Sequence, residues 1–502
     1  MALTPIQLPP GLERNNTPYD TTGRWWDMNL VRWQSGTMRP VGGWTKSTTT
    51  ALDSAIRKIF VYRQNNNNQT VLIGTDGKLY TDQSGYTDIT PSGFTPLSNV
   101  SIANGYGTLA YGAYTYGTAR PGTPVLFPPY GYWTMSNWGE DVILTANSDG
   151  RLYYYVSATS TVAPTVISAA PTGVNAVIVT DERHVMVIGA GSGGLTDRTV
   201  GWSSREDYTD WNFSSTTNTA GFQQLASRTP LLRGVKVKEG VLIFSSTDVF
   251  LSQYVGLPFV YGFNRISDAA MMHPDSIAAF NGKAVWLGRN GFQLYNGGFV
   301  QPLECPLLDD ILSDFNPIYG AFRCHASHHG LYPEVWFFYA STNSLEADRY
   351  VIWNYVENWW AWGSLSRSAM SAAEVYRYPY MGASDGNIYQ HEDGWTNDGT
   401  SRVGTIYAET GALGIGNGDQ FMNVGQVLAA SGSGYDKLSL TMIAQNTPEG
   451  AERTFGPYTM RSNGYADCRV TGREARIRFS AIQDGEWGVG KVRLDLTPGG
   501  GR

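Results

Sequence analysis

Cys324, His325, His328 and His329 form the only cluster of histidines in the sequence, and Cys305 lies upstream. Thiolates and imidazoles are the ligands that zinc prefers, and structural zinc sites hold four of them at paired spacings such as C-x2-C or H-x3-H. Cys324 with His328 is not a standard pairing on a strand, where successive side chains face opposite ways. We expect these residues to lie in a turn at the edge of a sheet and to bind no metal, with a metal site as the alternative.

A glycine-rich stretch, Gly189–Gly194, follows the apolar run that ends at Ile188 and has the glycine pattern of a dinucleotide-binding loop. Such a loop needs a helix directly after it, because the helix N-terminus receives the pyrophosphate. Residues 195–202 are instead rich in β-branched side chains and include Gly201. The stretch therefore predicts a flexible hairpin turn, and we expect no nucleotide cofactor.

Three carboxylates, Asp309, Asp310 and Asp314, fall within Leu307–Phe315, whose apolar spacing predicts a short helix. They could serve as paired carboxylates or as calcium ligands, but the EF-hand spacing with its glycine and terminal glutamate is missing. Acidic residues in a first helical turn more commonly complement the helix dipole on an exposed face. A glycosidase pair would come from separate segments, and sequence alone cannot pair distant carboxylates.

The P-loop and the zinc motif H-E-x-x-H are absent from the sequence. We therefore predict no catalytic, cofactor-binding or metal-binding residues and no enzyme activity. A binding or a structural protein is favoured.

The segment from Arg453 onward is locally basic. Alternation along Arg469–Phe479 places Arg476 and Arg478 on one face of a predicted strand. This face could contact an acidic protein or a phosphate backbone. The simpler alternative is a solvated strand face with ion pairs to neighbouring strands.

These candidates must be positioned by a β-rich fold, because one hairpin cassette recurs along the chain. In Val71–Tyr80 an apolar strand runs into an Asp-Gly turn, and a second strand opens with Leu-Tyr. Similar cassettes occupy Val142–Tyr155, Ala284–Gly298 and Tyr380–Gly394, and the turn glycines are Gly77, Gly150, Gly291 and Gly386. Asp-Gly and Asn-Gly supply the positive φ that tight hairpins need. A repeated β-hairpin with an aromatic residue at a fixed offset is typical of β-propeller blades.

The distribution of residue types and strand patterns divides the chain into three parts and predicts an all-β fold. We interpret residues 1–45 as an extended arm followed by strands. Residues 46–400 predict a β-propeller of six blades, or seven if the N-terminal strands complete one. Residues 401–502 predict a separate C-terminal antiparallel β-domain of the sandwich or jelly-roll type.

Residues 105–140 form an insert rich in glycine, tyrosine and proline, with almost no charge. A loop of this length in a compact domain is usually functional, and tyrosines offer contact area at a low entropic cost. We expect it to project from the propeller and to pack against another chain or border a channel exit. The side chains that would make this contact are Tyr106, Tyr111, Tyr114, Tyr116, Tyr130, Tyr132 and Trp133. The alternative is a flexible surface excursion.

Composition limits the classes of protein that the chain can belong to. At 502 residues and 42% apolar content it can bury a large core, and its net charge of −7 does not favour a protein that wraps nucleic acid. Cys305, Cys324 and Cys468 are scattered, which predicts a reducing compartment and no disulfide framework. The N-terminus lacks a signal sequence, and no apolar run is long enough to span a bilayer. We expect a soluble protein that inserts into no membrane and leaves a cell only by assembly and lysis.

Two segments resemble tail nozzle proteins, also called packaged-DNA stabilisation proteins, of short-tailed bacteriophages. Asn29–Trp44 is similar to the opening of these proteins, and Glu182–Asn212 is similar to a segment in the middle of their chains. The ending, Thr471–Phe479 together with Trp487–Asp495, also looks like a phage tail protein. The similar segments lie near both ends and in the middle of the chain. None of these motifs is catalytic.

The resemblance implies a structural virion protein, a β-propeller subunit of a homohexameric ring in the viral tail, assembled in the host cytoplasm. The ring would extend the channel of the portal and its adaptor (head-completion) protein, retain the packaged DNA and let it exit during infection. It would contact tail fibre or spike proteins, and double-stranded DNA would pass through the lumen without sequence specificity. A mildly acidic lumen would let DNA slide, whereas a basic one would hold it by counterion release.

Two other functions stay open on the residues alone. A carbohydrate-binding, lectin-like propeller could stack sugar rings on Trp359, Trp360 and Trp362 at a blade edge. A propeller glycoside hydrolase would instead hold carboxylates at its central mouth.

Overall fold

In the residues that the computed structural model describes, the regular structure consists of forty β-strands, one short α-helix and three 3-10 helices. The structure describes residues 3–14, 17–83, 85–97, 131–159, 161–192, 194–317, 320–414, 418–430, 432–447 and 450–499. The helices are η1 (Ser157–Thr159), α1 (Leu308–Asp314), η2 (Gly320–Phe322) and η3 (Tyr435–Lys437). The all-β fold class predicted from the sequence is confirmed.

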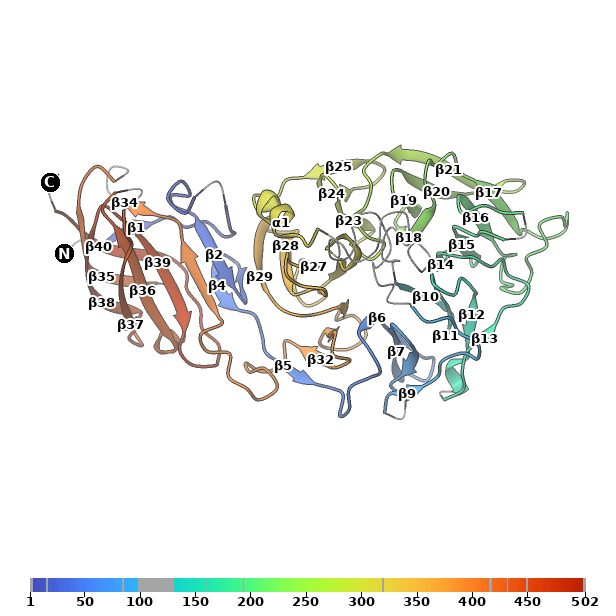
Figure 1. Ribbon diagram of the computed structural model, residues 1–502, viewed down its shortest axis with the longest axis horizontal. Helices are drawn as coiled ribbons and strands as arrows, with labels where there is room; N and C mark the ends of the chain where they lie inside the picture. Colours follow the sequence, from blue (N-terminus) through green and yellow to red (C-terminus); the bar gives the residue numbers. More distant parts are fainter. Residues whose placement is uncertain are drawn as a thin grey trace, which may run out of the picture.

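The larger part of the molecule, on the right in Figure 1, contains seven four-stranded antiparallel sheets, here called blades 1 to 7. Blade 1 is β6 (Ile56–Arg63), β7 (Gln69–Thr75), β8 (Leu79–Thr81) and β9 (Thr87–Asp88), and blade 2 is β10 (Trp133–Trp138), β11 (Asp141–Ala146), β12 (Tyr153–Tyr155) and β13 (Thr165–Val166). Blade 3 is β14 (Ala176–Val179), β15 (Val185–Ile188), β16 (Thr199–Trp202) and β17 (Gly221–Gln224), and blade 4 is β18 (Leu231–Val237), β19 (Gly240–Ser245), β20 (Val249–Gly256) and β21 (Val260–Ser267). Blade 5 is β22 (Ile277–Phe280), β23 (Lys283–Gly288), β24 (Gly291–Tyr295) and β25 (Val300–Leu303), and blade 6 is β26 (His325–His328), β27 (Glu334–Tyr339), β28 (Arg349–Asn354) and β29 (Trp359–Ser364). Blade 7 is β30 (Ala369–Ser371), β31 (Tyr380–Gly382), β32 (Ile388–His391) and β5 (Trp44–Lys46).

The blades close into a ring. The first strands of successive blades lie beside one another in chain order, and β30 of blade 7 lies against β6 of blade 1. Blade 7 is completed by β5, which comes from the N-terminal part of the chain and pairs Thr45 with Gln390 of β32. A circular arrangement of four-stranded sheets defines a β-propeller. The fourth strand of the last blade therefore comes from the opposite end of the propeller sequence.

The recurring cassette is the turn between the second and third strands of blades 1, 2, 5 and 7. Gly150, Gly291 and Gly386 have the positive φ that the sequence predicts, at 66°, 116° and 79°. Gly77 does not have a positive φ. A larger residue is excluded there by lack of space, because a Cβ would collide with the carboxylate of Asp53. The second strands are continuous apolar runs, since neighbouring blades cover both of their faces. All four residues of β15 and all six of β27 are buried.

Two further sheets form the part on the left in Figure 1. One sheet has the order β1 (Leu3–Ile6), β40 (Val492–Pro498), β35 (Met422–Ala429) and β38 (Tyr465–Gly472). The other has the order β2 (Trp25–Asn29), β33 (Tyr407–Thr410), β39 (Glu474–Ala481), β36 (Leu438–Gln445) and β37 (Arg453–Thr459), and β34 (Leu413–Gly414) pairs with β39. Their inner side chains share one apolar core, as the contact of Cys468 with Met442 illustrates at 3.9 Å. This is the antiparallel β-sandwich that the sequence predicts.

The N-terminal strands do not stand apart from the two domains. β1 pairs with β40 and β2 pairs with β33, so both complete sheets of the sandwich. A hairpin of β3 (Val31–Gln34) and β4 (Thr37–Pro40) follows, with positive φ at Ser35 and Gly36. Residues 1–45, which the sequence suggests as a separate arm, thus supply strands to both neighbouring units.

In the described residues, no helix has the length and apolar character needed to cross a membrane.

Candidate functional site

The axis of the propeller contains a cavity of about 400 Å³. Its wall comes from the first strands of blades 1 to 6 and from the segment after β30. Two of these strands, β6 and β18, carry a β-bulge, at Ile56/Lys58 and at Leu231/Arg233. A bulge inserts an unpaired residue and re-aims the side chains beside it. Both bulges bring basic residues to the axis.

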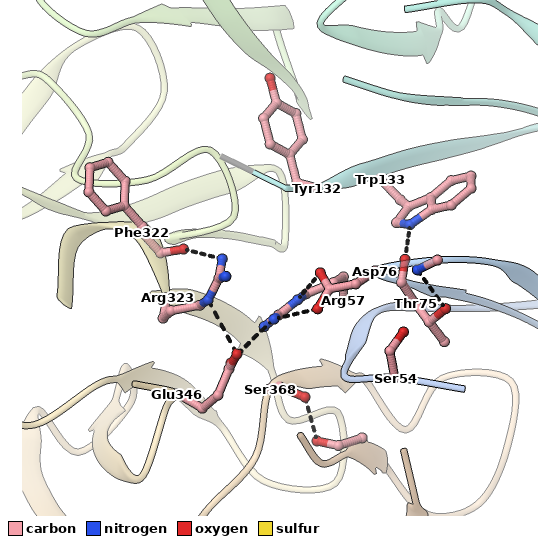
Figure 2. Close-up of polar contacts among 12 residues, drawn as sticks. Ser54, Arg57, Thr75, Asp76, Tyr132, Trp133, Phe322, Arg323, Glu346 and Ser368 are labelled. Atoms are coloured by element: carbon pink, nitrogen blue, oxygen red, sulfur yellow. Dashed lines mark hydrogen bonds and ion pairs between the residues drawn. The ribbon is translucent and has the colours of Figure 1, made fainter. Parts of the chain in front are cut away.

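Arg57 lies at one end of this axis, between two carboxylates (Figure 2). Its guanidinium donates to both oxygens of Asp76 at 2.7 and 2.8 Å and to both oxygens of Glu346 at 2.7 Å. Arg323 Nε lies 3.4 Å from Glu346 Oε1. Although burial raises the pKa of Glu346, hydrogen bonding and attraction from Arg57 outweigh this, and its pKa is lowered overall. Two arginines and two carboxylates therefore form a closed, neutral group.

His273, Asp275 and Arg233 form a second group. Arg233 Nη1 lies 3.5 Å from Asp275 Oδ1, and His273 Nδ1 accepts from the backbone N–H of Asp275 at 3.1 Å. His325 stacks on Phe338 with ring centroids 4.7 Å apart. Burial lowers the pKa of His273 to about 4 and that of His325 to about 3, so both rings are neutral at pH 7.

Lys58 is the basic residue of the axis that makes no ion pair with any described residue. It lines the 400 Å³ cavity together with Arg233. Burial and the nearby Arg233 lower the pKa of Lys58 to about 8, and Asp275 acts in the opposite direction. These axial cations are not among the candidate residues that the sequence patterns indicate. The sequence feature that could indicate them is Arg57-Lys58, two adjacent charged residues within a largely apolar strand.

The Cys324–His329 segment does not form the turn at a sheet edge that the sequence suggests, because His325–His328 is β26, the first strand of blade 6, and the side chains have separate partners. Cys324 is buried and its thiol donates to Gly320 O at 2.9 Å, and burial raises its pKa. His328 Nε2 lies 3.2 Å from the Tyr355 hydroxyl, and His329 Nε2 lies 3.4 Å from Glu392. Within the described ranges, no three His, Cys, Asp or Glu side chains are grouped so that they could hold a metal ion. Cys305 is half-buried, and burial raises its pKa as well.

The glycine-rich stretch Gly189–Gly194 connects two strands, β15 and β16. The described residues between Ile188 and Thr199 contain no helix, so no helix N-terminus is present to receive a pyrophosphate. Gly193 lies outside the described residues. The predicted hairpin connection is confirmed.

The short helix predicted at Leu307–Phe315 is present as α1. Two of its carboxylates are held by arginines from other segments: Arg14 Nε lies 3.2 Å from Asp310, and Arg349 Nε lies 3.4 Å from Asp314. These side chains thus tie the helix to its surroundings.

The two arginines of β39 form ion pairs across the sheet. Arg476 pairs with Glu409 of β33 and with Glu452, the latter at 2.6 Å. Arg478 Nη1 lies 3.6 Å from Glu409, and its guanidinium covers the Tyr407 ring at 3.7 Å. Of the two interpretations, the cross-strand ion pairs are the arrangement found.

The tryptophans suggested for sugar stacking are not on an open edge. Trp359 and Trp360 are 2% and 3% exposed, because residues 11 and 12 of the N-terminal segment cover β29. Trp362 Nε1 donates to Asp27 at 3.0 Å, and Arg14 covers its ring at 4.3 Å. The suggestion that these rings are available to a carbohydrate is therefore wrong. These rings are covered or bonded by N-terminal residues that are remote from them in the sequence.

The end of the predicted insert also belongs to the core. Tyr132 and Trp133 are fully buried. The Tyr132 hydroxyl donates to Leu232 O at 2.8 Å, and Trp133 Nε1 donates to Thr75 O at 2.9 Å (Figure 2). These two rings are therefore not part of a projecting surface. Residues 98–130, with the other tyrosines of the insert, lie outside the described residues.

Asn29–Trp44, the first segment of the phage resemblance, lies at the junction of the two domains. Arg32 of β3 is buried with Glu334 of blade 6, whose Oε1 is 3.2 Å from Arg32 Nε. The loop at Gly42 passes so close to Glu392 that a Cβ would lie 2.5 Å from that carboxylate. The motif is therefore an architectural one.

Comparison with known proteins adds little beyond the fold. No protein-family model matches the chain, and no curated protein matches it. Among solved structures, it is similar to YCF48 bound to a D1 peptide, with 10% identity over 73% of this chain and 97% of that one and a TM-score of 0.39. It is also similar to a catalytically inactive virginiamycin B lyase from Staphylococcus aureus with quinupristin, with 7% identity over 69% and 94% of the two chains and a TM-score of 0.34. A fungal alcohol oxidase in complex with copper gives 9% identity over 98% and 99%, with a TM-score of 0.39.

These similarities are too low to carry a function. The ring of four-stranded sheets and the two packed sheets define the class by themselves: an all-β protein in which a β-propeller is joined to a β-sandwich.

Proposed function

We propose that the chain is a structural subunit of a ring-shaped tail nozzle of a short-tailed bacteriophage, a homohexamer that extends the channel of the portal and adaptor. The ring would hold the packaged DNA and release it during infection, and would present sites for fibre or spike proteins. The proposal rests on the sequence resemblance of Asn29–Trp44, Glu182–Asn212 and the C-terminal strands. One structural observation also supports it: the tip of blade 4 is apolar.

In blade 4, β20 and β21 extend as a paired ribbon to a tip at residues 254–260. Val249 to Ser252 are buried at the base of the ribbon, whereas Leu257 and Phe259 at its tip are 73% and 76% exposed. Tyr254 and Val255 are exposed beside them. Soluble monomers rarely leave adjacent large apolar side chains bare. A neighbouring copy in a ring would cover them.

The axis of a single propeller is not a path for DNA. The cavity there measures about 400 Å³, and the Arg57–Glu346 ion pair lies at one end of the axis. The major groove of B-DNA alone is about 12 Å wide. A lumen for duplex DNA would therefore have to lie between several copies of the chain. The net charge of −7 per chain is compatible with a mildly acidic lumen, which would let DNA slide.

A structural role is favoured over a hydrolase by the state of the axial carboxylates. Glu346 is held by Arg57, Asp275 by Arg233, and Glu374 lies 3.8 Å from His328. Retaining glycosidases need one ionised and one protonated carboxyl group about 5–5.5 Å apart. Glu346 and Asp275 are instead paired with arginines and Glu374 lies beside an imidazole, so the proposal assigns no chemistry to these three carboxylates.

The test is the oligomeric state, measured by native mass spectrometry and by end-on class averages in electron microscopy, with and without the adaptor protein. We expect six copies in a ring. The variant Leu257→Ser/Phe259→Ser should remain folded and lose the ring. A matched variant, Leu345→Ser/Val356→Ser, removes two other apolar side chains that are 63% and 70% exposed and should keep it.

A stable monomer at high concentration in the presence of the adaptor would contradict the proposal. Rings that form equally well without the apolar tip would show that blade 4 is not the contact.

A further inference from the structure

We propose that the axial cavity of the propeller is a binding site for a small organic monocarboxylate. The carboxylate would lie at Lys58 and Arg233, and its short apolar body would lie against the first strands of the blades. This site is independent of ring formation, because every residue that builds it belongs to one chain.

Of the three cations that line the cavity, Lys58, Arg233 and Lys236, one has no ion-pair partner among the described residues. Arg233 is matched by Asp275 at 3.5 Å, and Lys236 is matched by Asp181 at 3.0 Å. Glu374 lies 3.8 Å from His328. Lys58 has no carboxylate within ion-pair distance among the described residues. The cavity therefore calls for a ligand with a single negative charge.

Hydrogen-bond donors surround the same space. The Thr134 hydroxyl oxygen accepts from Val177 N at 2.9 Å, and that of Ser136 accepts from Val179 N at 3.0 Å. With their oxygens used as acceptors by the backbone, these hydroxyl groups have their hydrogens left to donate. Both side chains line the cavity beside Lys58. A carboxylate accepts up to four such bonds, which makes it a suitable partner.

Part of the wall is apolar, beside the polar side chains of Asn137, Lys236, Ser327, His328 and Glu374. Phe60, Met135, Ile178 and Ile277 face the cavity, with small alanine side chains from blades 5 and 6 between them. Ligand pockets for small molecules combine such an apolar lining with a few placed polar groups, and they measure about 300–1,000 Å³. The cavity of about 400 Å³ falls at the small end of this range. A short aliphatic carboxylate fits both the volume and the lining.

The protonation of Lys58 controls the site. The charged and titratable groups around it are Arg233, Asp275 and His325, together with Lys236, His328 and Glu374, which line the same cavity. Burial lowers the pKa of His325 to about 3, so this ring is neutral near pH 7. Since the pKa of free Lys58 is about 8, affinity for a carboxylate should be constant from about pH 6 to 7.5 and should fall above pH 8.

The experiment is isothermal titration calorimetry of the full chain with butyrate as the probe, and with butyramide and inorganic phosphate for comparison. We expect butyrate to bind at pH 7, butyramide to bind at least about tenfold more weakly and phosphate to bind more weakly than butyrate. Lys58→Met should raise the Kd for butyrate by about tenfold or more. Lys78→Met, which removes a surface lysine paired with Asp88 outside the cavity, should leave the Kd unchanged.

A second measurement on the unsubstituted protein keeps the proposal testable if Lys58→Met does not fold. In protein labelled with ¹³C-lysine, the Cε resonance of Lys58 should titrate near pH 8 and shift to a higher pKa with saturating butyrate. The proposal is overturned if no butyrate binding is found at millimolar concentration. It is also overturned if butyramide or phosphate binds as well as butyrate, if Lys58→Met binds butyrate normally, or if the Lys58 resonance is unaffected by butyrate.

Discussion

Arg32 and Glu392 are 360 positions apart in the sequence, and Arg32 Nη2 donates a 2.7 Å hydrogen bond to Glu392 Oε1 in the interior of the protein. Arg32 lies on the hairpin that leads out of the sandwich, and Glu392 directly follows the third strand of blade 7. The backbone N–H of Gly42 donates to the second oxygen of Glu392 at 3.0 Å. One carboxylate therefore fixes the chain on both sides of β4. The ion pair connects the two domains near the point where β5 enters the propeller.

The first prediction concerns the stability that this ion pair provides. Arg32→Met should lower the free energy of unfolding by about 3–5 kcal/mol, because it leaves the carboxylates of Glu334 and Glu392 buried without their cation. Chemical denaturation followed by tryptophan fluorescence measures the change. The control is Arg461→Ala, which breaks an ion pair whose side chains are 60% and 51% exposed and should cost less than about 1 kcal/mol. Equal losses for the two variants would contradict the prediction.

The second prediction concerns acid sensitivity. The pKa of His325 falls from 6.5 to about 3 in the folded protein, chiefly because of burial, while Asp275 opposes the shift. Between these values the unfolded chain binds a proton that the folded chain does not. The contribution of this residue to stability is therefore lost progressively as the pH falls from 6.5 toward 3.

Replacing His325 by Phe removes the proton uptake and keeps an aromatic ring next to Phe338. The urea midpoint of His325→Phe should therefore change less between about pH 7 and pH 4.5 than that of the parent protein. If the urea midpoint of the variant changed with pH as much as that of the parent protein, His325 would be protonated in the folded state.

The third prediction concerns the turn of the blade 7 cassette. Gly386 has φ of 79°, and a Cβ there would lie 2.6 Å from Leu52 O. Gly139 has φ of 69° with nothing within 4 Å of its Cβ position. Gly139→Ala should cost about 1–2 kcal/mol from backbone strain alone, and Gly386→Ala should cost more because strain and collision add. The thermal unfolding of the two variants measures these costs. An equal loss of stability would show that the collision with Leu52 adds nothing to the backbone strain.

The fourth prediction concerns metal. We expect no metal at the Cys324–His329 segment, whose side chains have other partners in the structure. Elemental analysis should find no stoichiometric zinc, and the unfolding midpoint should be the same with and without EDTA. One zinc per chain that is lost together with stability on chelation would reverse this expectation.

Local features of the chain could be predicted from the sequence because their causes are local. The turn dipeptides and alternating strands of the cassette specify hairpins through residues that are neighbours in the chain, and they are found at Gly150, Gly291 and Gly386. The short helix at Leu308–Asp314 follows from apolar spacing within one segment. A repeat of such units was sufficient to predict a β-propeller.

Contacts between distant segments were decided by the tertiary structure. Nothing near Trp44 in the sequence indicates that β5 pairs with β32, or that β1 pairs with β40 at the other end of the chain. The same holds for Trp359 and Trp360, whose aromatic character suggests a surface for stacking until the N-terminal segment is placed over them.

The axial site has the same origin. Lys58 and Arg233 are 175 positions apart, and only closure of the ring brings the first strands of six blades around one cavity. The sequence determines that a cation lies within an apolar strand. The free energy of that charge, and hence its capacity to bind an anion, depends on the burial and the neighbouring charges that the closed ring imposes.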